Sequence, residues 1–123
     1  MKDPSNPVCR TISTLLSRIG DKWTVLVVQT LKEGPRRFNE LRREIPSVSQ
    51  RMLTLTLRNL ERDGLVNRTV TPSIPPRVDY ELTQLGKSLQ KPICELAAWA
   101  KDHVDEIHDA QARFDAQQDK QAA

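Results

Sequence analysis

Residues 49–62 read SQRMLTLTLRNLER, and their spacing places two chemically different faces on one helix. At about 100° per residue, one side collects three leucines and predicts a face that packs into a core. These leucines are Leu53, Leu57 and Leu60. The opposite side carries bases and a hydroxyl, from Arg51, Thr54, Arg58 and Arg62, and Leu55 lies in the middle of it. We expect such a helix to offer its outward face to a partner.

A second, shorter helix is predicted just before this one, over residues 38–45. Pro46 ends it, because proline has no backbone N–H and does not continue a helix. Ser47 with Gln50 three residues later is typical of a capping box, and Ser49 is the alternative cap of the next helix. Two helices joined by a short turn predict a helix-turn-helix over 38–63, whose second helix enters the major groove of DNA.

After this helix the apolar residues follow a strand pattern. Asp63-Gly64 ends the helix, and apolar residues then alternate over 65–71 and 78–83. The loop PSIPPR (72–77) holds three prolines, which fix its shape. These residues predict a β-hairpin, or wing, over 65–83.

Apolar stripes at helical spacing occur at both ends of the chain. A helix expected over 9–19 carries Ile12, Leu15, Leu16 and Ile19. A heptad seam over 93–114 includes Val104 and Ile107. Pro92 predicts a kink or break before this seam, and the polar tail after it is expected to fray. Because the core is complete without these stripes, they predict the interface of a homodimer.

The expected fold class is therefore mainly α with a small β-hairpin. We expect a single winged helix-turn-helix domain over 1–123, with dimerisation helices at 9–19 and 93–114.

Arginine is concentrated in the middle of the chain. Residues 36–77 hold nine arginines, no lysine and four acidic residues, whereas residues 101–123 hold three basic and six acidic ones. A guanidinium group suits phosphates and guanine edges better than an ammonium group does. Most charge runs are solvated, salt-bridged surface. Here the separation of the basic residues from the acidic residues along the chain favours double-stranded DNA as the partner.

The outward face of residues 49–62 fits a base-reading role. Arg51 and Arg58 can donate to guanine O6 and N7, and Leu55 can pack on a thymine methyl group. For Leu55 the alternatives are contact with a partner protein or a merely tolerated exposed leucine. Arg62, a turn further along, suits a phosphate.

Other classes of protein are not expected. No apolar stretch approaches the roughly 20 residues of a membrane span, and the N-terminus lacks the apolar core of a signal peptide. We therefore expect a cytoplasmic protein that binds no membrane. His103 and His108 point about 140° apart on a helix, and no phosphate loop, metal spacing or nucleophile–base pair occurs. We expect no enzyme, metal or cofactor. The rival function is a helical protein-interaction module with an incidental basic surface.

Three segments together resemble a known family: GDKWTVLVV (20–28), GPRRFNELRREIPSVSQRMLTLTLRNLERDGLV (34–66) and IPPRVDYELTQLGKSL (74–89). They resemble the HxlR-type transcriptional regulators, a branch of the MarR-like winged helices, over about three quarters of the chain. The resemblance implies a bacterial homodimeric regulator, expected to be a repressor on a palindromic operator. Such proteins dimerise through their first and last helices.

The resemblance also implies roles for single residues. Arg36 and Arg37 match the basic pair before the short helix and would contact phosphates. The recognition-helix positions are matched by Ser49, Gln50, Arg51, Thr54 and Arg58. Leu55 departs from the polar residue expected there, so the operator sequence does not follow from the family. Arg77 matches the wing arginine of a Pro-Pro-Arg motif, suited to the minor groove or its flanking phosphates.

Cys9 is close to the N-terminal cysteine that some members of this family use to sense oxidants or electrophiles. In those members proline often follows the cysteine, whereas Arg10 follows here. A neighbouring cation and a helix N-terminus both favour the thiolate. An inert interface thiol is the alternative. Cys94 is expected in the core. A small-molecule or redox effector is compatible with the family, but the sequence does not identify it.

Overall fold

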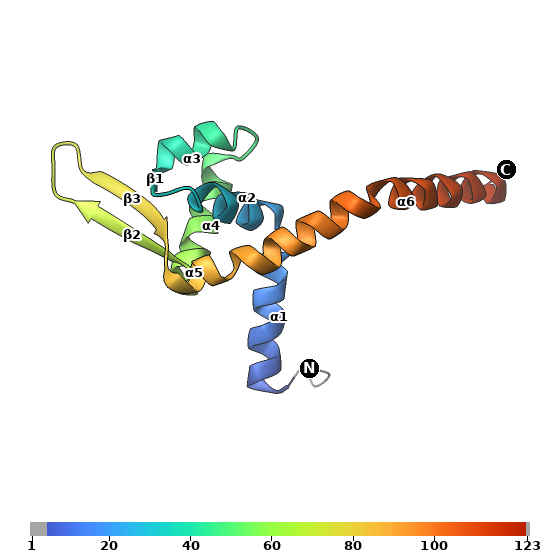
Figure 1. Cartoon of the computed structure of the whole chain (residues 1–123), viewed down its shortest axis with the longest axis horizontal. Helices are drawn as coiled ribbons and strands as arrows, with labels where there is room; N and C mark the ends of the chain where they lie inside the picture. Colours follow the sequence, from blue (N-terminus) through green and yellow to red (C-terminus); the bar gives the residue numbers. More distant parts are fainter. Residues whose placement is uncertain (1–4, 123) are drawn as a thin grey trace. The chain divides into compact units, whose positions relative to one another are not determined.

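The computed structural model describes residues 5–122 (Figure 1). The chain divides into two compact units, Met1–Gln90 and Lys91–Ala123. The first unit holds the mixed fold, and the body of one long helix makes up the second. In chain order the elements are α1 (Pro7–Ile19), α2 (Lys22–Leu31), β1 (Arg36–Arg37), α3 (Phe38–Glu44), α4 (Gln50–Arg62), β2 (Val66–Thr71), β3 (Arg77–Leu82), α5 (Gln84–Ser88) and α6 (Gln90–Ala122). The mainly α, winged helix-turn-helix prediction is confirmed.

The ends of α4 are set by local capping groups. Ser49 Oγ accepts a hydrogen bond from the Met52 N–H at 3.0 Å, so Ser49 is the N-cap rather than Ser47. At the other end Gly64 has a φ of 77°, and the Leu65 N–H donates to the Leu60 carbonyl oxygen at 2.9 Å. This left-handed glycine closes the helix and turns the chain toward the wing.

The first two helices also start at capping side chains. Asn6 Oδ1 accepts from the Val8 N–H at 2.9 Å, and Asp21 Oδ1 accepts from the Trp23 N–H at 2.8 Å. Proline fits the first position of a helix, where its missing N–H would have no helical partner. α1 therefore begins at Pro7 and not at Cys9 as predicted.

The core of the first unit is aliphatic, as the composition requires. α4 contacts α2 and β2, and its leucines at the predicted inward positions are buried. Burying one such side chain contributes about 1.5–3 kcal/mol, so this face determines how α4 is turned. The buried partners from the other elements are Val27, Val28 and Leu31 of α2, Leu41 of α3, Val66 of β2 and Leu82 of β3.

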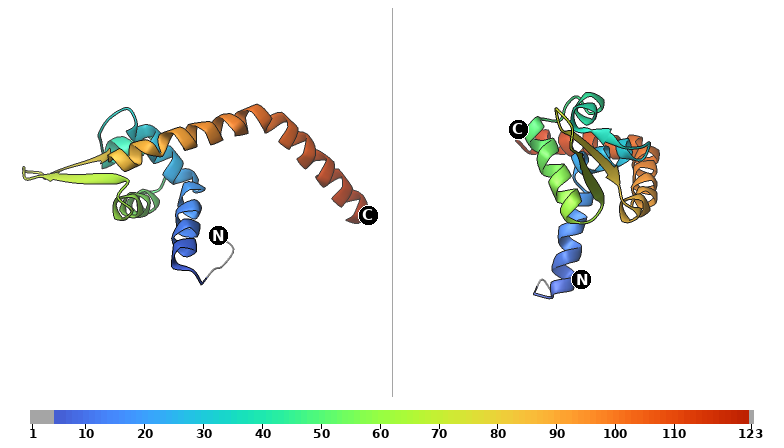
Figure 2. Two further views of the ribbon diagram at one scale, coloured as in Figure 1. Left: turned by 60° about the horizontal axis from the view of Figure 1, so that its bottom comes forward. Right: turned by 90° about the vertical axis from the view of Figure 1, so that its left-hand side faces the viewer.

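The wing belongs to a three-stranded sheet in the order β1-β3-β2. β2 and β3 pair antiparallel from Val66 opposite Leu82 to Thr71 opposite Arg77. Figure 2 shows this hairpin projecting beyond the helices of the first unit. β1 pairs with the other edge of β3, with Arg36 opposite Tyr80. The predicted hairpin lacked this strand, because two residues are too few to show an alternating pattern.

Arg36 differs from its predicted role as a phosphate contact. Its side chain is only 18% exposed, and its Nε donates to Glu44 Oε2 at 2.8 Å. Its Nη2 donates to Glu33 Oε2 at 3.4 Å, and its Nη1 donates to the carbonyl oxygens of Gly34 and Pro35, both at 3.1 Å. The guanidinium group thus joins the segment after α2 to α3. We assign Arg36 to the fold rather than to the DNA interface.

A tight junction connects the base of the wing to α5. Thr83 Oγ1 accepts from the Gly86 N–H at 3.0 Å and donates to the Gly64 carbonyl oxygen at 2.6 Å. The Thr83 N–H donates to the Leu65 carbonyl oxygen at 3.1 Å. A Cβ at Gly86 would overlap that same oxygen, so only glycine allows this approach. Thr83 therefore caps α5 instead of ending the second strand.

Three predictions about the C-terminal part of the chain are wrong: the place of the break, the fraying of the tail and the burial of Cys94. The break falls at Leu89, between α5 and α6, and not at Pro92, which lies in the first turn of α6 where proline is tolerated. The tail predicted to fray is helical as far as Ala122. Cys94, expected in the core, is exposed.

The predicted seam of α6 keeps apolar surface open to solvent, since Val104 is 41% exposed and Ile107 is 38% exposed.

We expect Gly86→Ala to lower the free energy of unfolding by about 1–3 kcal/mol or more, because the added methyl group overlaps the Leu65 carbonyl oxygen. Urea unfolding followed by circular dichroism measures the change. Gly20→Ala is the matched control, because Gly20 has a φ of −76° and an added Cβ there would lie 3.3 Å from the Leu16 carbonyl oxygen. Gly86→Ala unfolding at the same urea concentration as the wild type would contradict the tight junction.

Arg36→Ala is expected to destabilise the protein by roughly 1–3 kcal/mol, because it removes charge-assisted hydrogen bonds around a largely buried guanidinium group. Thermal unfolding measures this loss. Arg42→Ala, on the exposed side of α3, is the control and should change stability little. If Arg36→Ala kept the wild-type stability but bound DNA more weakly, the result would contradict this structural role and support the predicted contact of Arg36 with a phosphate.

Candidate nucleic-acid interface

α4 presents the predicted outward face to solvent. Arg51, Thr54 and Arg58 are exposed, and Leu55 among them is about half exposed. With Gln50, the first residue of the helix, these side chains line one shallow concavity. The structure therefore brings together the residues predicted to read bases, on a single surface of one capped helix.

Two residues predicted for this surface have other positions. Ser49 Oγ is occupied by the N-cap hydrogen bond to the Met52 N–H, so Ser49 acts by starting the helix. Arg62 lies in the last turn of α4, where it borders a crevice beside α1 together with Arg10 and Thr14. A cation in this turn also interacts favourably with the helix dipole. Arg62 is thus separate from the concavity of the recognition face.

An ion pair between Arg18 and Asp63 joins α1 to the C-cap of α4. Both side chains are largely shielded from water, since they are 19% and 13% exposed. A shielded pair resists screening by salt better than a surface pair does. The recognition helix is therefore attached to α1 as well as to the core beneath it.

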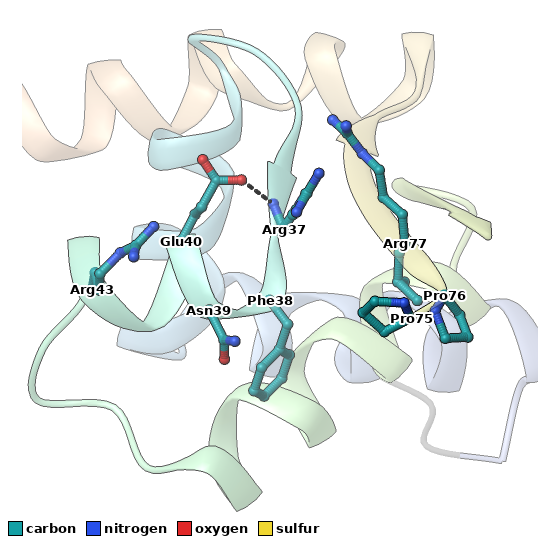
Figure 3. Close-up of a pocket in the computed structure, with 9 residues that line it drawn as sticks. Arg37, Phe38, Asn39, Glu40, Arg43, Pro75, Pro76 and Arg77 are labelled. Atoms are coloured by element: carbon teal, nitrogen blue, oxygen red, sulfur yellow. Dashed lines mark hydrogen bonds between the residues drawn. The ribbon is translucent and has the colours of Figure 1, made fainter. Parts of the chain in front are cut away.

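A second basic site lies between α3 and the wing (Figure 3). A cleft of about 680 Å³ is lined by residues from β1, α3, the wing loop and β3. Arg37, Arg43 and Arg77 bring three guanidinium groups to it, and Phe38 with Pro75 and Pro76 supplies apolar surface. Guanidinium groups presented along one cleft by separate elements suit the phosphate backbone of a nucleic acid.

Acidic side chains at this cleft leave its arginines able to bind an anion. Glu40 Oε1 accepts from the backbone N–H of Arg37 at 2.9 Å, so this bond does not use the guanidinium group. Asp79 Oδ2 accepts from Arg77 Nε at 2.9 Å, and the Arg77 side chain is still half exposed. Arg37 and Arg77 therefore keep guanidinium N–H donors that Glu40 and Asp79 do not occupy.

Arg43 was absent from the predicted interface. It belongs to the arginine-rich middle of the chain, and that was its only sequence signal. Arg43 lies near the end of α3, on the side of the cleft away from Pro76 and Arg77 in Figure 3. It shares a cleft with these wing residues because β1 pairs with β3 and brings α3 next to the wing.

The sequence also drew attention to Cys9 and to the residue types that bind metals. Cys9 is buried as the third residue of α1. Within residues 5–122, no group of three or more His, Cys, Asp or Glu side chains is arranged to hold a metal ion. No helix in that part of the chain is long and apolar enough to span a membrane.

Two solved structures of regulators have a similar architecture. The redox regulator HypR in its reduced form superposes with a TM-score of 0.73 at 39% identity, covering 80% of this chain and 98% of that one. The reduced form of the transcriptional regulator YodB from Bacillus subtilis gives a TM-score of 0.66 at 39% identity, covering 73% of this chain and 88% of that one.

Curated relatives and a family model agree with this likeness. An uncharacterized HTH-type transcriptional regulator of Methanothermobacter thermautotrophicus is 50% identical over 91 residues, which are 74% of this chain and 70% of the relative. The uncharacterized HTH-type transcriptional regulator YdeP of Bacillus subtilis is 42% identical over 101 residues, 82% of this chain and 79% of the relative. The HxlR-like helix-turn-helix model matches residues 18–108. With its winged fold and its exposed α4 face, the chain belongs to the HxlR-like family of helix-turn-helix transcriptional regulators.

Proposed function

We propose that this protein is a homodimeric repressor that binds a palindromic operator with α4 in the major groove. The observation that carries the proposal is the exposed face of α4, which combines two arginines, a hydroxyl and a leucine opposite a buried leucine face. Repression would follow from occupancy, because a dimer spanning two half-sites covers DNA that RNA polymerase needs.

The interface divides into base contacts and phosphate contacts. Arg51 and Arg58 would donate to guanine edges, Thr54 would bond a neighbouring base, and Leu55 would cover a thymine methyl group. The cleft between α3 and the wing would hold the backbone through Arg37, Arg43 and Arg77. Arg62 would contact a phosphate beside α1.

A second copy of the chain is the proposed cover for the apolar stripes of α1 and α6. Leu16 is more than half exposed, and Ile12, Leu15 and Ile19 are partly exposed. Val104 and Ile107 leave a similar surface on α6. A two-fold dimer would place its α4 helices in half-sites about 34–36 Å apart, one turn of B-DNA.

We expect Arg51→Ala and Arg58→Ala each to weaken binding to a duplex selected from the source genome by about 1–3 kcal/mol, while random duplex is affected less. Arg37→Ala should weaken both duplexes alike and reduce the salt slope by about 1. Fluorescence anisotropy over a salt series measures both effects. Equal losses on selected and random DNA for Arg51→Ala would contradict the major-groove assignment. Transcription from a promoter that overlaps the selected site should fall when the wild-type protein is added.

Sedimentation at micromolar concentration should give the mass of a dimer. Leu16→Glu should shift the mass toward the monomer, because it places a charge within the proposed apolar contact. Thr14→Glu adds the same charge at an exposed position about 160° around α1 from Leu16 and should leave the dimer intact. A monomeric mass for the wild type would contradict the proposed assembly.

We also propose that operator binding weakens when an oxidant such as diamide joins the Cys9 thiol to a second thiol in a disulfide and takes up the two hydrogens. The support is the position of Cys9 in the first turn of α1, the ion pair that joins α1 to α4, and the likeness to the redox regulator HypR. Binding to the selected duplex should fall after treatment with diamide and recover after reduction, and Cys9→Ser should not respond. Equal binding by the oxidised and reduced wild type would make Cys9 an inert thiol of the α1 interface.

A further inference from the structure

The tip of the wing carries an aliphatic side chain that the fold does not use. Ile74 lies in the loop between β2 and β3 and is fully exposed, at 103% of its reference area. The other exposed large apolar side chains of the described residues reach at most 65%. Turn apices favour Gly, Pro, Asn, Asp and Ser rather than β-branched aliphatic residues. Ile74 therefore presents its whole apolar surface to whatever approaches the wing.

The loop holds Ile74 in a defined position. Ser73 Oγ donates to the Pro75 carbonyl oxygen at 2.8 Å, bridging the isoleucine. Pro72, Pro75 and Pro76 restrict the backbone on both sides. The strands beneath remain paired as far as Thr71 and Arg77. A side chain on such a rigid loop loses little conformational freedom when it binds.

We propose that Ile74 enters the minor groove of the operator as a wedge between two base pairs and kinks the duplex. The inference rests on the proposed function, because it takes the DNA bound by α4 as the partner. Aliphatic wedges inserted from the minor groove partly unstack one base step and bend DNA by about 20–90° toward the major groove.

The dimensions and charges of the hairpin fit this partner. Strands of six residues, at about 3.3 Å per residue, carry the tip about 20 Å from the base of the wing. Half a turn of B-DNA, about 17 Å, separates a major groove from the neighbouring minor groove. Arg77 directly follows the loop and Arg68 lies on β2, and both are exposed and able to contact the phosphates that flank the groove.

A wedge would add specificity at base pairs that α4 does not touch. Pyrimidine–purine steps unstack more easily than other steps, so an operator with such a step under the wing costs less to deform. The operator should therefore favour TA or CA/TG at one position in each half-site, outside the bases read by Arg51 and Arg58.

The test uses the wild-type protein and a duplex that it selects from random sequence. A fluorescent adenine analogue is placed at one position at a time, and a donor and acceptor pair is attached to the duplex ends. Anisotropy on the same samples reports binding. We expect a rise in analogue fluorescence at one step per half-site and a shortened end-to-end distance.

Three variants assign these signals to the side chain. Ile74→Thr keeps the β-branched shape but adds a hydroxyl, and it should bind without the fluorescence rise or the bend. Ile74→Leu should keep both signals. Val70→Thr makes the same kind of change at a half-exposed position of β2, one pair before the last pair of the hairpin and outside the loop, and it should also keep both. Because Ile74 buries nothing in the protein, Ile74→Thr should unfold at the wild-type temperature.

The outcomes separate the wedge from the regulator proposal. Saturable binding by the wild type with no change in fluorescence or end-to-end distance would overturn the wedge and leave the regulator proposal standing. Bending that persists unchanged in Ile74→Thr would also overturn the wedge. The absence of saturable binding to any selected duplex would overturn both.

Discussion

Burial of one face of α4 is the constraint on which the rest of the structure depends. Three leucines of this helix are covered by α2 and β2, and each contributes roughly 1.5–3 kcal/mol of apolar burial. Turning the helix by even a quarter of a revolution would expose them. The opposite face, with Arg51 and Arg58, is therefore directed outward by packing that involves no arginine at all.

The wing is not an independent arm, because its base is bonded to the end of α4 and to α5. Gly64 closes α4, and Thr83 donates to the Gly64 carbonyl oxygen while it accepts from the N–H of Gly86. This network holds the two ends of the hairpin together just beyond the recognition helix. The position of the wing is consequently coupled to the position of α4.

The arginines divide into two groups according to their neighbours. Arg36 and Arg18 have acidic partners and little exposed surface, and they hold elements of the fold together. Arg37, Arg43, Arg51 and Arg58 lie on exposed surface and suit a polyanion. The pair between Arg18 and Asp63 also gives α1 a direct connection to α4, so a change in α1 packing has a short route to the recognition helix.

The sequence by itself determined many of the features that have a short-range cause. Helical spacing identified both faces of α4, alternation identified the hairpin strands, and local signals such as Ser49 and Gly64 placed the helix ends to within a few residues. Tertiary structure alone decided the pairing of β1 with β3, the internal hydrogen bonds of Arg36 and the place of Arg43 in the cleft that the wing also lines. The physical reason is that the spacing of apolar residues along a helix or strand indicates which side of it is buried. The neighbour of a polar side chain depends instead on segments far away in the chain. Arg36 and Arg37 show this clearly: they are adjacent and chemically identical, yet alternate side-chain directions along β1 send one toward Glu44 and the other to the cleft.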